Sequence, residues 1–142
     1  MAEGLILFYA DDDLDDLDMF REVVNELGQE IRLYTHNHGE MLLSALRTSP
    51  SPQIIFLDLN MPGKDGFDVL AELKGSPDLK DIPVVIFSTS IDERNISRSY
   101  RLGANYYLPK STTFAGFKKS LQHTLGINWN TFTPTSANFV YR

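Results

Sequence analysis

The sequence contains no cysteine, which excludes disulfide bonds and thiol chemistry. It has no opening apolar segment of the secretory type and no apolar run near the ~20 residues that a membrane-spanning helix needs. Its 13 lysines and arginines form no basic stripe, and 19 acidic residues bring the net charge to −6. These absences lead us to expect a cytoplasmic protein that binds neither nucleic acid nor membranes.

Apolar runs and helical patterns alternate along a chain whose length fits one domain. Three of the runs, LILFYA, IIFLD and VVIFS, are continuously apolar, as is typical of parallel strands covered on both faces. The run IRLYT alternates instead, and Pro109 lacks an N–H, which suits two edge strands. The pattern predicts an α/β fold, a doubly wound five-stranded parallel sheet in the order 2-1-3-4-5. The expected strands are Leu5–Ala10, Ile31–Thr35, Ile54–Asp58, Val84–Ser88 and Asn105–Pro109.

Helical spacing fills the gaps between these runs. Apolar residues at Leu17, Phe20 and Val24 mark the first helix, and Phe114 begins the last. The stretch Ser90-Ile91-Asp92-Glu93 has the form of a capping box, which predicts that the fourth helix opens at Ser90. Five strand–helix units therefore account for most of the chain.

Polar side chains follow four of the expected strands. Asp11 and Asp12 come after the first, Asp58 ends the third, Ser88 ends the fourth and Lys110 follows the fifth. In a doubly wound sheet, ligands bind just beyond the carboxyl ends of the strands. We therefore expect three carboxylates, a hydroxyl and an ammonium to meet at one edge.

The residue types indicate the chemistry of this edge. Clustered carboxylates raise one another's pKa unless a cation offsets them, and oxygen ligands without histidine or cysteine favour Mg²⁺. A phosphoryl group could complete the site, with Ser88 and Lys110 binding its oxygens. Asp58 stands alone at the end of a central strand, which makes it the candidate nucleophile for an aspartyl phosphate, while Asp11 and Asp12 remain as ligands.

These residues resemble the response-regulator receiver domain of two-component signalling, in its stand-alone, single-domain form. The segment FLDLNMPGKDGFDVL (56–70) matches the D-x-x-M-P-x-x-D-G pattern of that family, and PVVIFSTS (83–90) and LGANYYLPK (102–110) match its fourth and fifth strand regions. The resemblance covers residues 4–126 and implies a flavodoxin-like fold of five βα units. Residues 127–142 lie outside it as a tail of unknown role.

The resemblance implies that Asp58 accepts a phosphoryl group from a sensor histidine kinase or a histidine phosphotransfer protein. It implies that Asp12, Asp58 and the backbone carbonyl of Asn60 hold Mg²⁺, with Asp11 acting mostly through water. Lys110 would pair with Asp58 before phosphorylation and with the phosphate afterwards.

The resemblance also implies a switch. Ser88 would hydrogen-bond the arriving phosphoryl group, and Tyr107 would rotate inward as Ser88 shifts. The family usually has Lys-Pro after the fifth strand, whereas this chain has Pro109-Lys110-Ser111, so a cis bond at Lys110–Ser111 would be costly. Serine in place of the commoner threonine at position 88 keeps the hydroxyl and should be benign.

Simpler interpretations suit several other residues. Asp13, Asp15, Asp16 and Asp18 are best explained as acids that complement a helix start, and His36 and His38 as surface histidines. The tail could fold back onto the domain, contact a partner or stay flexible, although its aromatic content is high for a disordered end. The aromatic residues in question are Trp129, Phe132, Phe139 and Tyr141.

The leading hypothesis is a phosphoacceptor switch that signals by contacting an unknown downstream protein and does not act as an enzyme on a separate substrate. The face of the protein that the fourth helix, fifth strand and fifth helix form could also support a homodimer. One alternative is a receiver-like interaction module that works without phosphorylation. Another is a Mg²⁺-dependent phosphatase with an aspartyl nucleophile, but Asn60 stands where the haloacid-dehalogenase type has a second acid.

Overall fold

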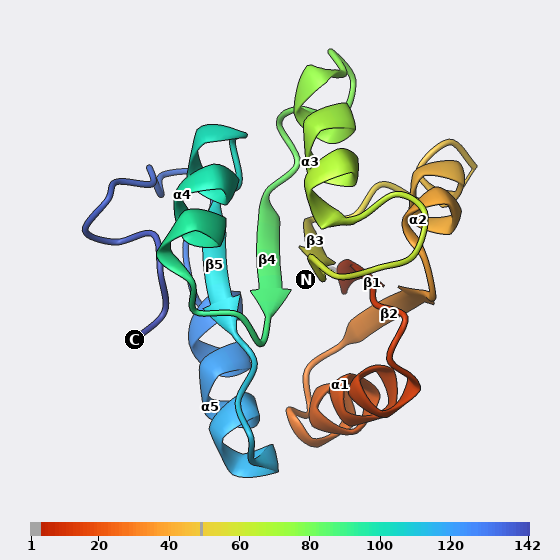
Figure 1. The fold of residues 1–142 in the computed structure, drawn as a ribbon. Coiled ribbons are helices and arrows are strands. Elements are labelled where there is room, and N and C mark those ends of the chain that lie inside the picture. Colours follow the sequence, from red (N-terminus) through yellow and green to blue (C-terminus); the bar gives the residue numbers. More distant parts are fainter. Residues whose placement is uncertain (1–3, 49) are drawn as a thin grey trace.

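A computed structural model describes residues 4–48 and 50–142 (Figure 1). Its strands pair in parallel in the order β2-β1-β3-β4-β5, which confirms the predicted doubly wound sheet. The elements are β1 (Leu5–Ala10), α1 (Leu14–Glu26), β2 (Ile31–His36), α2 (Gly39–Ala45), β3 (Ile54–Leu57), α3 (Gly66–Gly75), β4 (Val84–Ser88), α4 (Glu93–Arg101), β5 (Tyr106–Pro109) and α5 (Phe114–Leu125).

Helices cover the sheet on both faces, and this arrangement explains the continuously apolar strands. Successive side chains of a strand point to opposite faces, so Tyr9 packs with α1 and α5 while Phe8 packs with α2 and α3. Both side chains are fully buried. None of the helices in the described ranges is long and apolar enough to cross a membrane.

His36 corrects the prediction of two surface histidines. It is the last residue of β2, where it is only 6% exposed and packs against the ring of Phe8 with 5.0 Å between ring centroids. Its Nδ1 lies 3.3 Å from the Tyr9 carbonyl, and burial lowers the pKa of the imidazole. His38 is half-buried and caps α2 by accepting a hydrogen bond from the Met41 N–H. The two rings thus have structural roles in β2 and α2.

The predicted opening of the fourth helix at Ser90 is wrong by two residues. Asp92 is the N-cap of α4 and accepts a hydrogen bond from the Arg94 N–H at 2.8 Å. The Ser90 hydroxyl instead accepts from the Asp92 N–H and from the Asn95 side chain. Because both residues can cap a helix, the local sequence alone did not distinguish them.

The tail folds back along β5, the first of the three alternatives considered for it. The Tyr107 N–H donates to the Phe139 carbonyl and the Tyr141 N–H donates to the Tyr107 carbonyl, both at 2.9 Å. These bonds make a short parallel bridge between Tyr107 and Val140. The C-terminal segment therefore covers the outer edge of β5. In Figure 1 the dark blue end of the chain lies beside α4 and β5.

Candidate functional site

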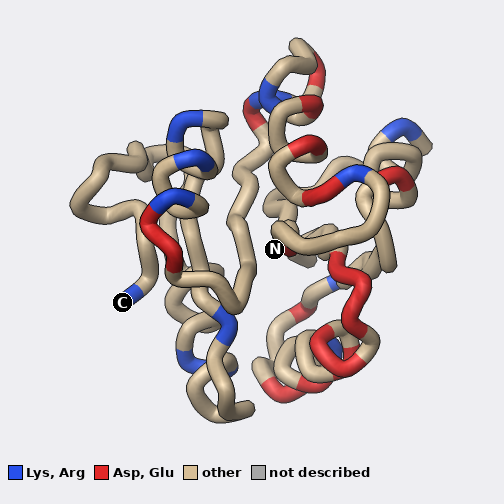
Figure 2. The backbone as a smooth tube through the Cα atoms, viewed as in Figure 1, with Lys and Arg blue, Asp and Glu red and all other residues tan. Residues whose placement is uncertain are grey.

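The polar residues predicted to meet do so at the carboxyl ends of the strands. The backbone holds these ends in line, because the Asp58 N–H donates to the Ala10 carbonyl at 3.0 Å and the Lys110 N–H donates to the Ser88 carbonyl at 2.8 Å. Acidic residues gather where the chain leaves β1 and enters α1 (Figure 2). The predicted residues therefore share one edge of the sheet.

Asp11, Asp12 and Asp58 form a cluster with the composition of a divalent-cation site. Each offers a carboxylate oxygen, and the three oxygens lie within 4.8 Å of one another. Asp11 and Asp58 are buried, whereas Asp12 is exposed and open to a ligand from solvent. A donor set made only of oxygen fits a hard cation such as Mg²⁺. Asn60 is exposed two residues beyond Asp58.

Lys110 places its ammonium among three carboxylates and is only 9% exposed. Its Nζ lies 2.8 Å from Asp11, 2.7 Å from Asp16 and 3.4 Å from Asp58. The expected pairing with Asp58 is thus its longest contact, and its hydrogen bonds go to the other two acids. Burial by itself would lower the pKa of Lys110, but the hydrogen bonds to Asp11 and Asp16 raise it, so the ammonium stays charged.

Asp16 is a site residue that the sequence reasoning assigned only to the start of a helix. It lies in the first turn of α1, four residues before Phe20 and eight before Val24, both of which are buried against the sheet. Residues four apart share a face of a helix, so this spacing could have placed Asp16 toward the site. Asp13, in contrast, is the N-cap of α1 and accepts from two backbone N–H groups.

Tyr9 is a second residue that the sequence reasoning missed. Its buried hydroxyl donates a hydrogen bond to Oδ2 of Asp11, and burial raises the pKa of the phenol. The Asp13 N–H donates to the other oxygen of the same carboxylate at 3.0 Å. Tyr9 precedes Asp11 by two residues on the same side of the chain, a spacing that sequence could have indicated. These donors hold the Asp11 side chain in one orientation.

The carboxyl group of Asp58 has a raised pKa. Burial, followed by the charge of Asp11, raises its pKa from 3.8 to about 7, although Lys110 acts in the opposite direction. Near neutral pH, without a further cation, a large share of Asp58 would be protonated. A bound divalent cation would favour the carboxylate, which is the form that can act as a nucleophile.

Asp58→Asn should stabilise the metal-free protein by about 1–3 kcal/mol at pH 8, because it removes a buried charge that repels Asp11. Since the folded-state pKa lies above that of the unfolded chain, folding takes up a proton between about pH 4 and 7. Wild-type stability should therefore fall as the pH rises through that window, and the variant should lack this slope. Urea unfolding at pH 5 and pH 8 measures the stability difference and the pH dependence, and Asp18→Asn, at an exposed position, is the control. Parallel pH profiles for wild type and Asp58→Asn would contradict the assignment.

Ser88 and Tyr107 connect the acidic site to the start of α4. Ser88 is fully buried, and its hydroxyl accepts a hydrogen bond from the Ser90 N–H at 3.1 Å. The ring of Tyr107 is fully buried as well, and its hydroxyl donates to the Ser90 carbonyl at 2.7 Å. The aromatic residue expected to rotate inward thus already lies inward in this structure.

Gly66 packs the first residue of α3 directly against the chain after Asp58. Its N–H donates to the Leu59 carbonyl at 2.9 Å, and a Cβ at this position would come 2.3 Å from the Asp58 carbonyl oxygen. Asp65 before it caps α3 in a reciprocal pair with Asp68. Only glycine lets the helix and the strand end approach this closely.

Comparison with known proteins places this site in a family. Residues 7–122 match the response regulator receiver domain. A 74-residue segment is 51% identical to response regulator Rcp1 of Synechocystis sp., and covers 52% of this chain. The chain spans about half the length of the first curated relatives it matches (50% of Rcp1).

Solved structures extend the similarity over nearly the whole chain. The Mn²⁺-bound form of Rcp1 is 34% identical, with a TM-score of 0.80 over 94% of this chain and 100% of the other. The phosphorylated cyanobacterial phytochrome response regulator RcpA is 32% identical, with a TM-score of 0.81 over 93% of this chain and 98% of the other. The family match, the strand order and the residues at the strand ends agree, and this chain belongs to the response regulator receiver domain family.

Proposed function

We propose that the chain is a phosphoacceptor switch that takes a phosphoryl group on Asp58. The observation that carries the proposal is the buried Asp58 carboxyl, which lies in an all-oxygen cluster with Asp11 and Asp12 and 3.4 Å from the Lys110 ammonium. Such a site can hold a cation and a phosphoryl group together. The positive charges of the cation and of Lys110 would offset the negative charges of the carboxylates and of the phosphoryl group.

The metal in this proposal is Mg²⁺, held by the carboxylates of Asp12 and Asp58 and by the backbone carbonyl of Asn60, with Asp11 acting mostly through water. The cluster fits a hard divalent cation, and the related Rcp1 is known in a Mn²⁺-bound form. When bound, the metal would supply positive charge beside the transferring phosphoryl oxygens. It would also lower the pKa of Asp58 and so increase the share of the nucleophilic carboxylate.

The residues of the chain would share the transfer in distinct roles. A carboxylate oxygen of Asp58 attacks the phosphorus of a phosphohistidine, the P–N bond breaks, and its electron pair stays on the imidazole, which then takes up a proton. Lys110 moves its contacts from the acids to the phosphoryl oxygens, and the Ser88 hydroxyl donates to another of them. Tyr107 would report the change to α4 through Ser90.

The partners in this proposal are a histidine kinase or histidine phosphotransfer protein and a downstream protein. RcpA is a phosphorylated phytochrome response regulator, so a phytochrome is the first class of donor to test. Catalysis would be limited to the protein's own phosphorylation and dephosphorylation. Turnover of a generic aryl phosphate would instead favour the phosphatase alternative.

The test is incubation with Mg²⁺ and acetyl phosphate, then with a phosphohistidine donor, followed by intact mass. We expect one hydroxylamine-labile phosphoryl adduct in the wild type and none in Asp58→Asn, a variant of the same size that lacks the nucleophile. An adduct that persists in Asp58→Asn would contradict the choice of nucleophile. If Mg²⁺ binds but neither donor leaves an adduct, the phosphoacceptor function is wrong and the phosphorylation-independent module takes its place.

A further inference from the structure

Residues 127–142, here named the C-terminal strap, enclose β5 from both faces of the sheet. On one face the rings of Trp129 and Phe132 pack edge-on against Tyr106, with centroid distances of 6.1 and 5.8 Å. On the other face Phe139, which is 2% exposed, packs near Tyr107 at 6.2 Å. The strap is therefore part of the hydrophobic core on that side.

Tyr107 is the residue at which the strap and the acidic site meet. Its backbone N–H and carbonyl are both bonded to the strap, through Phe139 and Tyr141. Its hydroxyl is bonded to the Ser90 carbonyl, and the Ser90 N–H is bonded to the Ser88 hydroxyl. A short chain of hydrogen bonds thus runs from the end of β4 to the strap.

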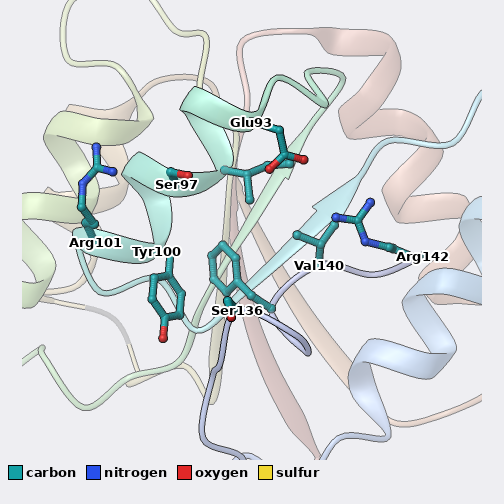
Figure 3. A pocket seen from close by; sticks show the side chains of 9 residues that line it. Glu93, Ser97, Tyr100, Arg101, Ser136, Val140 and Arg142 are labelled. Atoms are coloured by element: carbon teal, nitrogen blue, oxygen red, sulfur yellow. The ribbon is translucent and has the colours of Figure 1, made fainter.

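The strap also builds part of a hollow against α4. This space is lined by Glu93, Tyr100 and Arg101 of α4 and by Ser136, Val140 and Arg142 of the strap, all of which are labelled in Figure 3. The volume is about 220 Å³, and the Phe139 ring contributes to its wall. If the strap left β5, the hollow would lose one side and Phe139 would be exposed to solvent.

We propose that docking of the strap is coupled through Tyr107 to the phosphorylation state of Asp58. A docked strap holds Tyr107 buried, in the position from which its hydroxyl binds Ser90 next to Ser88. A phosphoryl group that binds Ser88 and stabilises this arrangement must also stabilise the docked strap, because coupling between two sites is reciprocal. This inference rests on the proposed phosphoacceptor function. Because the strap forms one wall of the hollow beside α4, phosphorylation would also stabilise the hollow.

Hydrogen exchange of the full chain tests the coupling. The protein is measured alone, with Mg²⁺, and with Mg²⁺ and acetyl phosphate or a phosphohistidine donor, and intact mass of the same samples gives the phosphorylated fraction. We expect exchange of residues 138–142 to slow about fivefold or more on phosphorylation. An adduct with unchanged exchange there would overturn the inference and leave the proposed function standing.

Two matched variants test the same connection without phosphate. Phe139→Ala removes the ring that packs near Tyr107, whereas Phe132→Ala removes an equal ring from the part of the strap that packs on the other face of the sheet. Only Phe139→Ala should speed exchange around Ser90, and Phe139→Leu repeats the comparison if the alanine variant does not fold. Equal exchange around Ser90 in the two variants would overturn the coupling. Failure to form any adduct would contradict the proposed function and, with it, the coupling to phosphorylation, whereas these two variants would still test the connection between the strap and Ser90.

Discussion

Lys110→Met is expected to lower the free energy of unfolding by about 3–5 kcal/mol at pH 8 without divalent metal, because it leaves buried carboxylates without their cation. The Lys110 side chain is 9% exposed, and its ammonium lies within 3.4 Å of Asp11, Asp16 and Asp58. Because Lys110 lowers the pKa of Asp58, its removal should raise that pKa above 7. The loss should therefore shrink as the pH falls and Asp58 is protonated, and it should shrink when Mg²⁺ is added.

Lys118→Met is the matched control for this prediction. Lys118 also forms an ion pair, with Glu26 at 2.9 Å, but its side chain is 34% exposed and water screens the charges. Exposed pairs contribute about 0–1 kcal/mol, so urea unfolding of this variant should stay close to wild type at every pH. Similar losses in the two variants, or a loss in Lys110→Met that Mg²⁺ leaves unchanged, would contradict the role given to Lys110.

Gly66→Ala should affect stability and phosphorylation together. The added Cβ would lie 2.3 Å from the Asp58 carbonyl oxygen and 2.7 Å from the Leu59 Cα, so the backbone next to the proposed phosphoacceptor must move. Overpacking of this kind costs about 3 kcal/mol of stability. A shift of about 1 Å in a reacting group can reduce a rate about a hundredfold, and we expect adduct formation from acetyl phosphate to slow by up to that factor.

Gly75→Ala separates this effect from the general effect of alanine in a helix. Gly75 ends α3, and a Cβ there would meet no atom within 4 Å. Its alanine variant should be as stable as wild type, or more stable by about 0.4–1 kcal/mol, and it should be phosphorylated at the normal rate. Unfolding curves and a time course of adduct formation for both variants would show the difference. A normal rate of phosphorylation in Gly66→Ala would contradict the prediction, because it would show that displacing the backbone after Asp58 does not affect the reaction.

Local sequence patterns predicted the sheet because they report burial directly. A strand between two helical layers must be apolar throughout, and the runs around Phe8, Phe56 and Val85 meet that condition. The strand order followed from IRLYT and Pro109, which suit the less covered edges. The convergence of Asp58 with Lys110 then required only that parallel strands end at one edge.

The details that sequence did not predict depend on contacts between distant segments. The hydrogen bond from Lys110 to Asp16 spans 94 positions, and no local rule separates Asp16 from the acids around it except the helix face it shares with Phe20. His36 is buried because Phe8 lies on the neighbouring strand, which its flanking residues do not reveal. The position of the strap likewise depends on Tyr107, which lies far from it in the sequence.

The 99 positions between Lys110 and Asp11 have a consequence for how the protein is made. Synthesis proceeds from the N-terminus, so the acidic residues of the first βα unit emerge long before their cation. A nascent chain that ends before Lys110 carries the carboxylates without the ammonium that offsets them, and without β5 at one edge of its sheet. If Asp58 accepts a phosphoryl group as proposed, acceptance should therefore begin only after Lys110 has been synthesised and has reached the acidic cluster.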